Sequence, residues 1–211
     1  MPKVSEQYKE EKRALVLQSA MSCFAQKGYA ATSIDDIVKQ AKMSKGAIYN
    51  YFRSKEEIFL TILDSRMAAM ETRLGEMFDG VTTASEKISR LFRNYIKLPS
   101  APETRMWVLI QLEFELYVTR HPELSFIPEK SETFLHDIYA NIIREGIENG
   151  EFHPDLNLKV ATHLFWMIRD GIAVHTSLMF RQDLPYEHFL QSAESMLLSF
   201  LKNGNGSLAE K

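Results

Sequence analysis

The chain of 211 residues has a single cysteine, Cys23, and no apolar run long enough to cross a membrane. One cysteine excludes an internal disulfide and a cysteine-based zinc cluster, and a membrane helix needs about 20 apolar residues. The opening sequence MPKVSEQYKEEKRA is charged and has no apolar signal core, so we expect a cytoplasmic protein. No His, Asp or Glu cluster has the spacing of metal ligands, and no phosphate loop or nucleophile–base pair is present. We therefore expect no metal, no cofactor and no enzymatic activity.

The sequence also lacks segments that alternate apolar and polar residues between hairpin turns, so β-strands are not expected. Apolar residues instead recur at helical spacing along nearly the whole chain. An all-α fold of about nine helices is predicted, at 5–27, 34–41, 44–51, 54–78, 83–97, 102–119, 129–148, 157–180 and 185–202.

Charge is divided unevenly along the chain. Residues 1–60 hold ten Lys and Arg against seven Asp and Glu, whereas residues 61–211 hold fifteen against twenty-one. This asymmetry suggests a basic module with an anionic partner, joined to an acidic body. We predict a basic domain of three helices at 1–53, a helical bundle at 54–203 and a flexible tail at 204–211.

The short helix predicted at 44–51 carries side chains that cannot all be buried. At 100° per residue, Ile48 and Phe52 share one face and are expected to pack inward. The other faces carry two small residues, one amide, one ammonium and two phenols: Lys45, Gly46, Ala47, Tyr49, Asn50 and Tyr51. Such a surface suits a DNA major groove, where Asn matches adenine and the longer side chains reach phosphates. With the helix before it, this segment has the spacing of a helix-turn-helix.

Residues 14–64, ALVLQSAMSCFAQKGYAATSIDDIVKQAKMSKGAIYNYFRSKEEIFLTILD, resemble the DNA-binding domain of the tetracycline-repressor (TetR) family of bacterial transcriptional regulators. The resemblance implies that matching positions line the DNA surface: Thr32, Ser33, Ser44, Lys45, Gly46, Tyr49, Asn50, Tyr51 and Lys55. One position departs from the family pattern. Lys42 stands where the family usually has glycine, so either a left-handed turn there costs on the order of 1 kcal/mol or the turn differs locally.

The resemblance also implies a C-terminal domain that binds a small effector. Several polar groups interrupt aromatic helical faces in this part of the chain, as expected of a pocket for an apolar or cationic molecule. The candidate lining residues are Arg90, Trp107, Gln111, Phe114, Glu115, Tyr139, Trp166 and His175.

The last two predicted helices carry more apolar surface than one protomer needs, and the corresponding helices form a dimer interface in the family. We expect this interface to include Phe165, Ile168, Ile172, Phe189, Ala193, Leu197 and Phe200.

Together these features predict a homodimeric repressor of an efflux or metabolic operon, with efflux preferred. Its recognition helices would enter successive major grooves of a pseudo-palindromic operator, and an effector would release it by moving the helix at 54–78. The alternative is a helical protein-interaction module without specific DNA readout.

Overall fold

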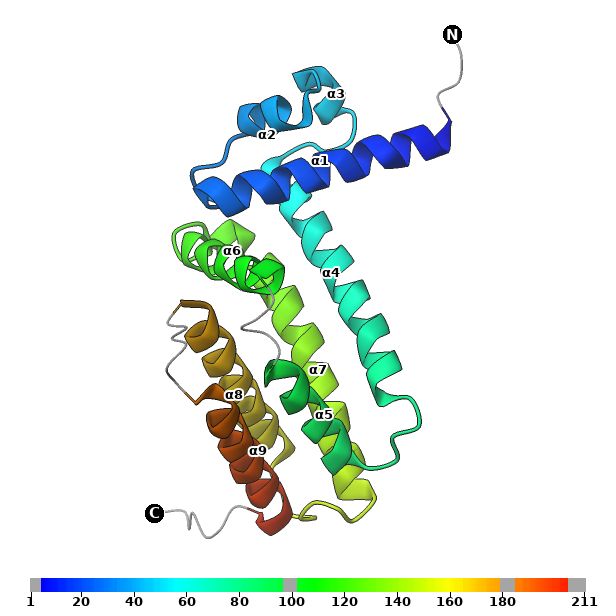
Figure 1. Ribbon diagram of the computed structural model, residues 1–211, viewed down its shortest axis with the longest axis vertical. Helices are drawn as coiled ribbons and strands as arrows, with labels where there is room; N and C mark the ends of the chain where they lie inside the picture. The colour runs from blue at the N-terminus through cyan, green and yellow to red at the C-terminus, as the bar shows by residue number, and fades with distance from the viewer. Residues whose placement is uncertain (1–4, 97–101, 179–184, 205–211) are drawn as a thin grey trace. The chain divides into compact units, whose positions relative to one another are not determined.

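The computed structural model describes residues 5–96, 102–178 and 185–204, and within these ranges every regular element is helical (Figure 1). The elements are α1 (Glu6–Lys27), α2 (Ile34–Ala41), α3 (Lys45–Tyr49), α4 (Lys55–Phe78), α5 (Ala84–Ile96), α6 (Pro102–Val118), the 3-10 helix η2 (Pro122–Leu124), α7 (Phe126–Glu148), α8 (Leu158–Leu178) and α9 (Tyr186–Asn203). This confirms the all-α prediction. Residues 205–211 of the expected tail, and the expected helix ends at 97 and 179–180, lie outside the described ranges. No helix in those ranges has both the length and the hydropathy needed to span a membrane.

Local side-chain chemistry sets the ends of the first helices. The Ser5 hydroxyl accepts a hydrogen bond from the Tyr8 N–H at the start of α1, and Gly28 ends that helix at φ 77°. Ser33 and Asp36 form a reciprocal capping box at the start of α2. At the start of α4, the Ser54 hydroxyl accepts from the Glu57 N–H, and the Glu57 carboxylate accepts from the Arg53 N–H.

One helix begins earlier than expected. α7 starts at Phe126 rather than near residue 129, because Pro128 falls in the first turn, where its missing N–H costs no hydrogen bond.

The chain divides into two compact units. Unit 1 comprises residues 1–70 and 109–128, and unit 2 comprises residues 71–108 and 129–211. Helices α4 and α6 therefore contribute residues to both units. This division by packing differs from the functional boundary predicted between residues 53 and 54, because the first turns of α4 and the end of α6 complete the core around α1.

The core of unit 1 is aromatic. Tyr29 is fully buried, and its ring makes edge contacts with Phe59 and Phe114, at centroid distances of 5.2 and 4.7 Å. Phe59 and Phe114 stack on each other at 4.1 Å. These rings pack α4 and α6 against the loop that follows α1. Because α2 begins at the end of this loop, the same packing supports α2.

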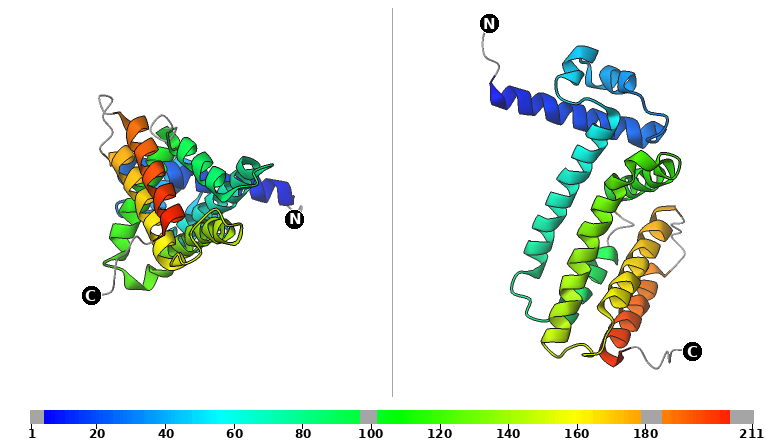
Figure 2. Two further views of the ribbon diagram at one scale, coloured as in Figure 1. Left: turned by 90° about the horizontal axis from the view of Figure 1, so that it is seen from below. Right: turned by 180° about the vertical axis from the view of Figure 1, so that it is seen from behind.

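The core of unit 2 is built where α5, α7, α8 and α9 meet. Phe165 of α8 is fully buried and stacks on Tyr139 of α7 at 4.3 Å and on Phe92 of α5 at 6.1 Å. α8 and α9 run side by side in each view (Figures 1 and 2). Glu151 accepts hydrogen bonds from the N–H groups of Ala84 and Ser85, which caps α5 from a distant loop.

Candidate DNA-binding surface

The turn between α2 and α3 adopts the left-handed conformation that the sequence indicated. Lys42 has φ 52° and ψ 40°, and it is the one non-glycine residue with positive φ in the described ranges. Its N–H donates to the carbonyl of Lys39, and the N–H of Met43 donates to that of Val38. This turn closes α2 and lets α3 begin three residues later, which is the spacing of a helix-turn-helix.

The faces of α3 are arranged as its periodicity predicted. Ile48 and Phe52 are buried, whereas Tyr49 is 46% exposed. Lys45, Gly46 and Asn50 are exposed, while Ala47 and Tyr51 are half-buried. A methyl group added at Gly46 would meet no atom within 4 Å, so among the described residues no side chain covers Gly46. The open surface of α3, comprising these six outward residues, is named the α3 face below.

Ser44 and Ser33 start the two short helices at the edge of the α3 face. The Ser44 hydroxyl accepts from the Ala47 N–H at 3.2 Å, which fixes the first turn of α3. Ser33 is exposed, and both its N–H and its hydroxyl donate to Asp36. Lys27 also pairs with Asp36 and, with the Ser33 bonds, holds the pKa of this carboxyl well below its usual range.

The structure corrects the sequence prediction for Thr32 and Lys55. Thr32 is 2% exposed, and its hydroxyl donates to the Gly28 carbonyl at 2.7 Å. The Lys55 ammonium donates to the carbonyls of Tyr29 and Thr32, both at 2.9 Å, and lies 4.3 Å from the centre of the Tyr29 ring. Burial lowers the pKa of Lys55. Both side chains point into unit 1. Helical spacing in the sequence does not predict this direction.

The residues predicted to line an effector pocket fall in both units. Gln111, Phe114 and Glu115 belong to unit 1, where Phe114 is part of the buried aromatic core. Arg90, Trp107, Tyr139, Trp166 and His175 belong to unit 2. Arg90 bonds to Glu86 and to the Met77 carbonyl, and His175 is exposed. We therefore omit Phe114 from the candidate pocket, because its ring is enclosed by Tyr29 and Phe59.

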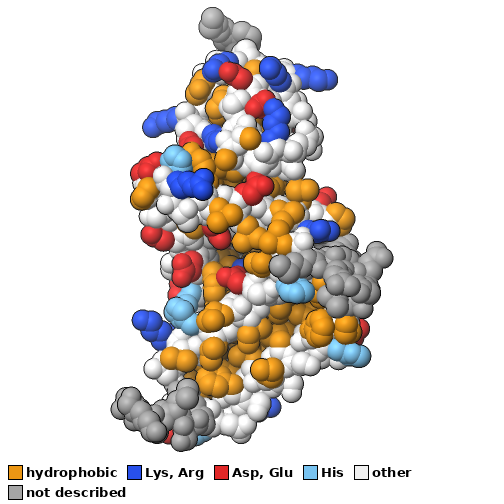
Figure 3. Space-filling view, turned by 90° about the vertical axis from the view of Figure 1, so that its left-hand side faces the viewer, with side chains coloured by type: hydrophobic (Ala, Val, Ile, Leu, Met, Phe, Trp, Pro, Cys, Tyr) orange, Lys and Arg blue, Asp and Glu red, His pale blue; other side chains and the backbone are white. Residues whose placement is uncertain are grey.

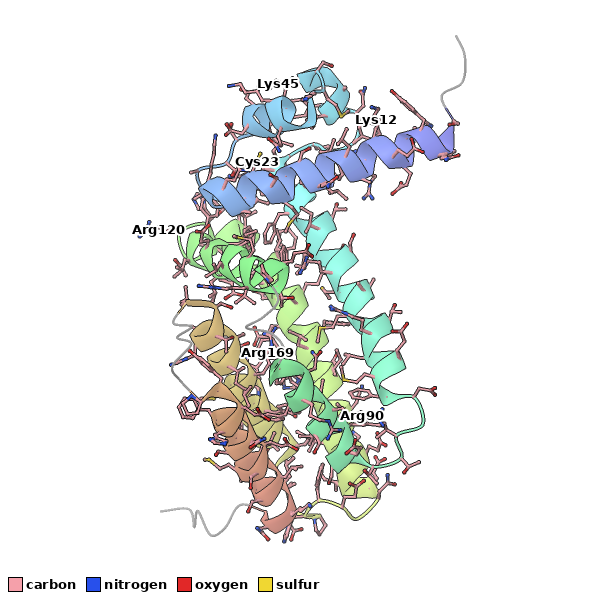
Figure 4. The ribbon with its side chains drawn as sticks, in the orientation of Figure 1. Lys12, Cys23, Lys45, Arg90, Arg120 and Arg169 are labelled. Atoms are coloured by element: carbon pink, nitrogen blue, oxygen red, sulfur yellow. The ribbon has the colours of Figure 1, made fainter. Side chains whose placement is uncertain are left out.

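Unit 2 does contain a buried polar group among aromatic rings. The hydroxyls of Tyr95 and Tyr139 lie 3.1 Å apart, and burial raises the pKa of both phenols. Arg169 of α8 interacts electrostatically with both phenols, pairs with Asp170 at 2.6 Å, and lies 5.8 Å from the Trp166 ring (Figure 4). The sequence prediction included Tyr139 and Trp166 but missed Tyr95 and Arg169.

The predicted dimer residues also divide into two groups. Phe165 and Leu197 are buried inside the protomer, so they have no surface to offer a second copy. Phe189 is exposed, while Ile168, Ile172, Ala193 and Phe200 are half-buried. Met167 and Met196, which are exposed, each precede a predicted interface residue by one position. The exposed large apolar side chains of the two helices are Val160, Met167 and Leu178 of α8 and Phe189 and Met196 of α9. These five residues are named the α8–α9 patch below. Figure 3 shows apolar side chains gathered low on one face.

Within the described residues, no group of three or more His, Cys, Asp or Glu side chains is arranged to hold a metal ion.

Three features define a helix-turn-helix DNA-binding protein: the open α3 face, the left-handed turn before α3, and the helix α2 that precedes this turn.

Comparisons with known proteins agree with this class. Residues 16–62 match the family model for bacterial regulatory proteins of the TetR family. The chain is 27% identical over 198 residues to the fatty acid metabolism regulator protein of Bacillus subtilis, covering 92% of this chain and 98% of the relative.

Two solved structures share the fold. FadR from B. subtilis in complex with stearoyl-CoA has a TM-score of 0.70 and 22% identity, covering 88% of this chain and 97% of that one. A Saccharomonospora viridis protein in complex with choline has a TM-score of 0.72 and 21% identity, with coverage of 93% and 97%. Residues 16–62 carry a DNA-binding domain of the TetR family of bacterial regulatory proteins, and the chain is a DNA-binding transcriptional regulator rather than an enzyme.

Proposed function

We infer that the protein works as a homodimeric repressor that binds a pseudo-palindromic operator and is released by a small molecule. The observation that supports this most directly is the α3 face. Its inward residues are buried, its outward residues are exposed or half-buried, and no described side chain covers Gly46 at its centre. In this proposal, Asn50 reads base edges while Lys45, Tyr49 and Tyr51 contact phosphates. The expected cytoplasmic location is part of the proposal, because operator DNA is found there.

The α8–α9 patch supports the homodimer. Met167 and Met196 are 64% and 72% exposed, and such large side chains in one apolar area are typical of an interaction surface. Gly171 lies on α8 one turn after Met167, and a methyl group added there would meet nothing within 4 Å. A second copy of the same two helices would cover this surface in a four-helix arrangement. The two recognition helices would then enter major grooves about 34 Å, or a multiple of it, apart.

For the effector we propose a fatty acyl derivative, and hence a metabolic rather than an efflux operon. The relative that is similar over almost its whole length is a fatty acid metabolism regulator. In this chain, the ion pair of Arg169 with Asp170 lies near the phenols of Tyr95 and Tyr139, and these groups offer hydrogen bonds to a polar acyl head group. To reduce operator occupancy from 99% to 1%, the effector must favour the non-binding state by about 5.5 kcal/mol.

Two measurements test the proposal. Operator DNA is selected from a random pool, and its binding is followed by fluorescence anisotropy at several salt concentrations. Tyr49→Ala and Asn50→Ala should each weaken binding by at least tenfold without lowering the melting temperature. Stearoyl-CoA should then release the wild-type complex, whereas choline should not. Unchanged binding by both variants would reject the α3 face, and release by choline alone would reject the acyl effector.

A further inference from the structure

The loop from Gly28 to Ser33 connects α1 to α2 and therefore sets where the helix-turn-helix begins. Side chains from distant helices hold two of its backbone positions. The Tyr29 N–H donates to Oε2 of Glu113 at 3.1 Å, from residue 113 on α6. The carbonyls of Tyr29 and Thr32 accept from Lys55 on α4. A carboxylate on the N–H side and an ammonium on the C=O side both make charge-assisted hydrogen bonds, which are stronger than neutral ones.

Gly28 allows the Glu113 carboxylate to approach this closely. A methyl group at Gly28 would collide with Oε2 of Glu113, and the φ of 77° already disfavours any other residue there. The carboxylate thus lies directly over the last turn of α1. Glycine is needed at this position both for the turn and for the contact.

The packing of α6 fixes the position of Glu113. Its neighbour Phe114 is buried between Tyr29 and Phe59, and Tyr117, one turn further, places its ring 5.3 Å from Tyr29. The Tyr29 ring is in turn anchored at its far end, where the hydroxyl donates to Glu56 at 3.1 Å. Because these contacts determine the rotation of α6, the Glu113 carboxylate is held in place before any DNA binds.

We propose that Glu113 is a positioning residue for operator binding, which holds the Gly28–Ser33 loop and thereby the start of α2 beside the recognition helix. The inference rests on the proposed function, since it assigns Glu113 a part in DNA affinity without a DNA contact of its own. A contact that served stability alone would change the melting temperature and leave the operator affinity of the folded protein unchanged.

The experiment compares Glu113→Ala and Glu113→Gln with the wild type in the full chain. Glu103→Gln is the matched control, because Glu103 is an exposed carboxylate in the first turn of the same helix. Operator affinity is measured by anisotropy on folded protein, and exchange of the Tyr29 amide is followed by NMR without DNA. Loss of the charge-assisted bond in Glu113→Ala should weaken operator binding about tenfold and speed exchange at Tyr29. Glu113→Gln, whose amide oxygen can still accept the bond, should recover part of both effects, and Glu103→Gln should match the wild type.

The proposal is overturned if Glu113→Ala exchanges faster at Tyr29 but binds the operator like the wild type. It is equally overturned if exchange at Tyr29 is unchanged, because the carboxylate would then not hold the loop. Should Glu113→Ala fail to fold, Glu113→Gln decides, since wild-type affinity together with wild-type exchange in that variant contradicts the inference. A wild-type protein that selects no DNA would instead refute the proposed function, while exchange in the free protein would still report whether Glu113 holds the loop.

Discussion

The Lys45 ammonium lies 2.8 Å from the Asp35 carboxylate, in an ion pair that joins the start of α3 to the first turn of α2 (Figure 4). Both side chains are more than half exposed, and the pair raises the pKa of Lys45. If Lys45 contacts a phosphate, Asp35 competes for the same cation and places a negative charge near the DNA backbone. Asp35→Asn should therefore tighten operator binding several-fold and make it more sensitive to salt.

Anisotropy titrations at a series of salt concentrations check this prediction. Asp79→Asn serves as a control with the same charge change, because Asp79 follows the end of α4 in unit 2. If Asp35→Asn binds the operator as the wild type does, or more weakly, then Asp35 does not compete with a DNA phosphate for the Lys45 ammonium.

Lys42→Gly should stabilise the protein, because Lys42 adopts a left-handed conformation that costs a residue with a Cβ about 1 kcal/mol relative to glycine. The gain is reduced by the greater freedom of glycine in the unfolded chain, so we expect about 0.5 kcal/mol. Urea denaturation measures the change. Lys39→Gly, inside α2, should destabilise by about 1 kcal/mol, and a loss of stability in both variants would contradict the role of the turn.

Substitutions of Gly46 should change DNA binding without lowering the stability of the fold. Because no atom lies near an added Cβ, Gly46→Ala and Gly46→Leu should both fold with unchanged or slightly higher melting temperatures. The leucine side chain would occupy the space that the duplex needs, so Gly46→Leu should abolish operator binding in a gel-shift assay. Full binding by a folded Gly46→Leu protein would exclude close approach of DNA to the centre of the α3 face.

Met167→Glu, combined with Met196→Glu, should convert the proposed dimer to monomers. Both side chains are exposed in the protomer, so the fold should persist while charge is placed in the α8–α9 patch. Sedimentation velocity measures the mass. Leu116→Glu is the matched control, because Leu116 is 70% exposed on α6 and lies outside the patch. A dimer that survives the double substitution would place the interface elsewhere.

Local sequence signals predicted much of the DNA-binding half. The inward pair Ile48 and Phe52 depends on spacing within one short helix, which a sequence shows directly. At Lys42 the resemblance left two alternatives, a left-handed turn or a local difference, and the structure shows the left-handed turn.

Local sequence signals did not predict contacts between residues that are far apart in the chain. Lys55 and Thr32 turn inward because the loop carbonyls and the Tyr29 ring offer better partners than solvent, and Glu113 reaches the loop from 84 residues away. In α8 and α9 both faces are apolar, so periodicity could not decide that Phe165 packs inward while Met167 remains exposed.

Selection of DNA by the wild-type protein, followed by hydroxyl-radical footprinting, tests the central claim most directly. The α3 face predicts an enriched sequence with two-fold symmetry, in which two protected regions lie on one side of the duplex about 34 Å, or a multiple of it, apart. The same footprint should disappear with Gly46→Leu. A protein that enriches no sequence, or that leaves the same footprint when Gly46 is replaced by leucine, would contradict the claim that the α3 face reads DNA.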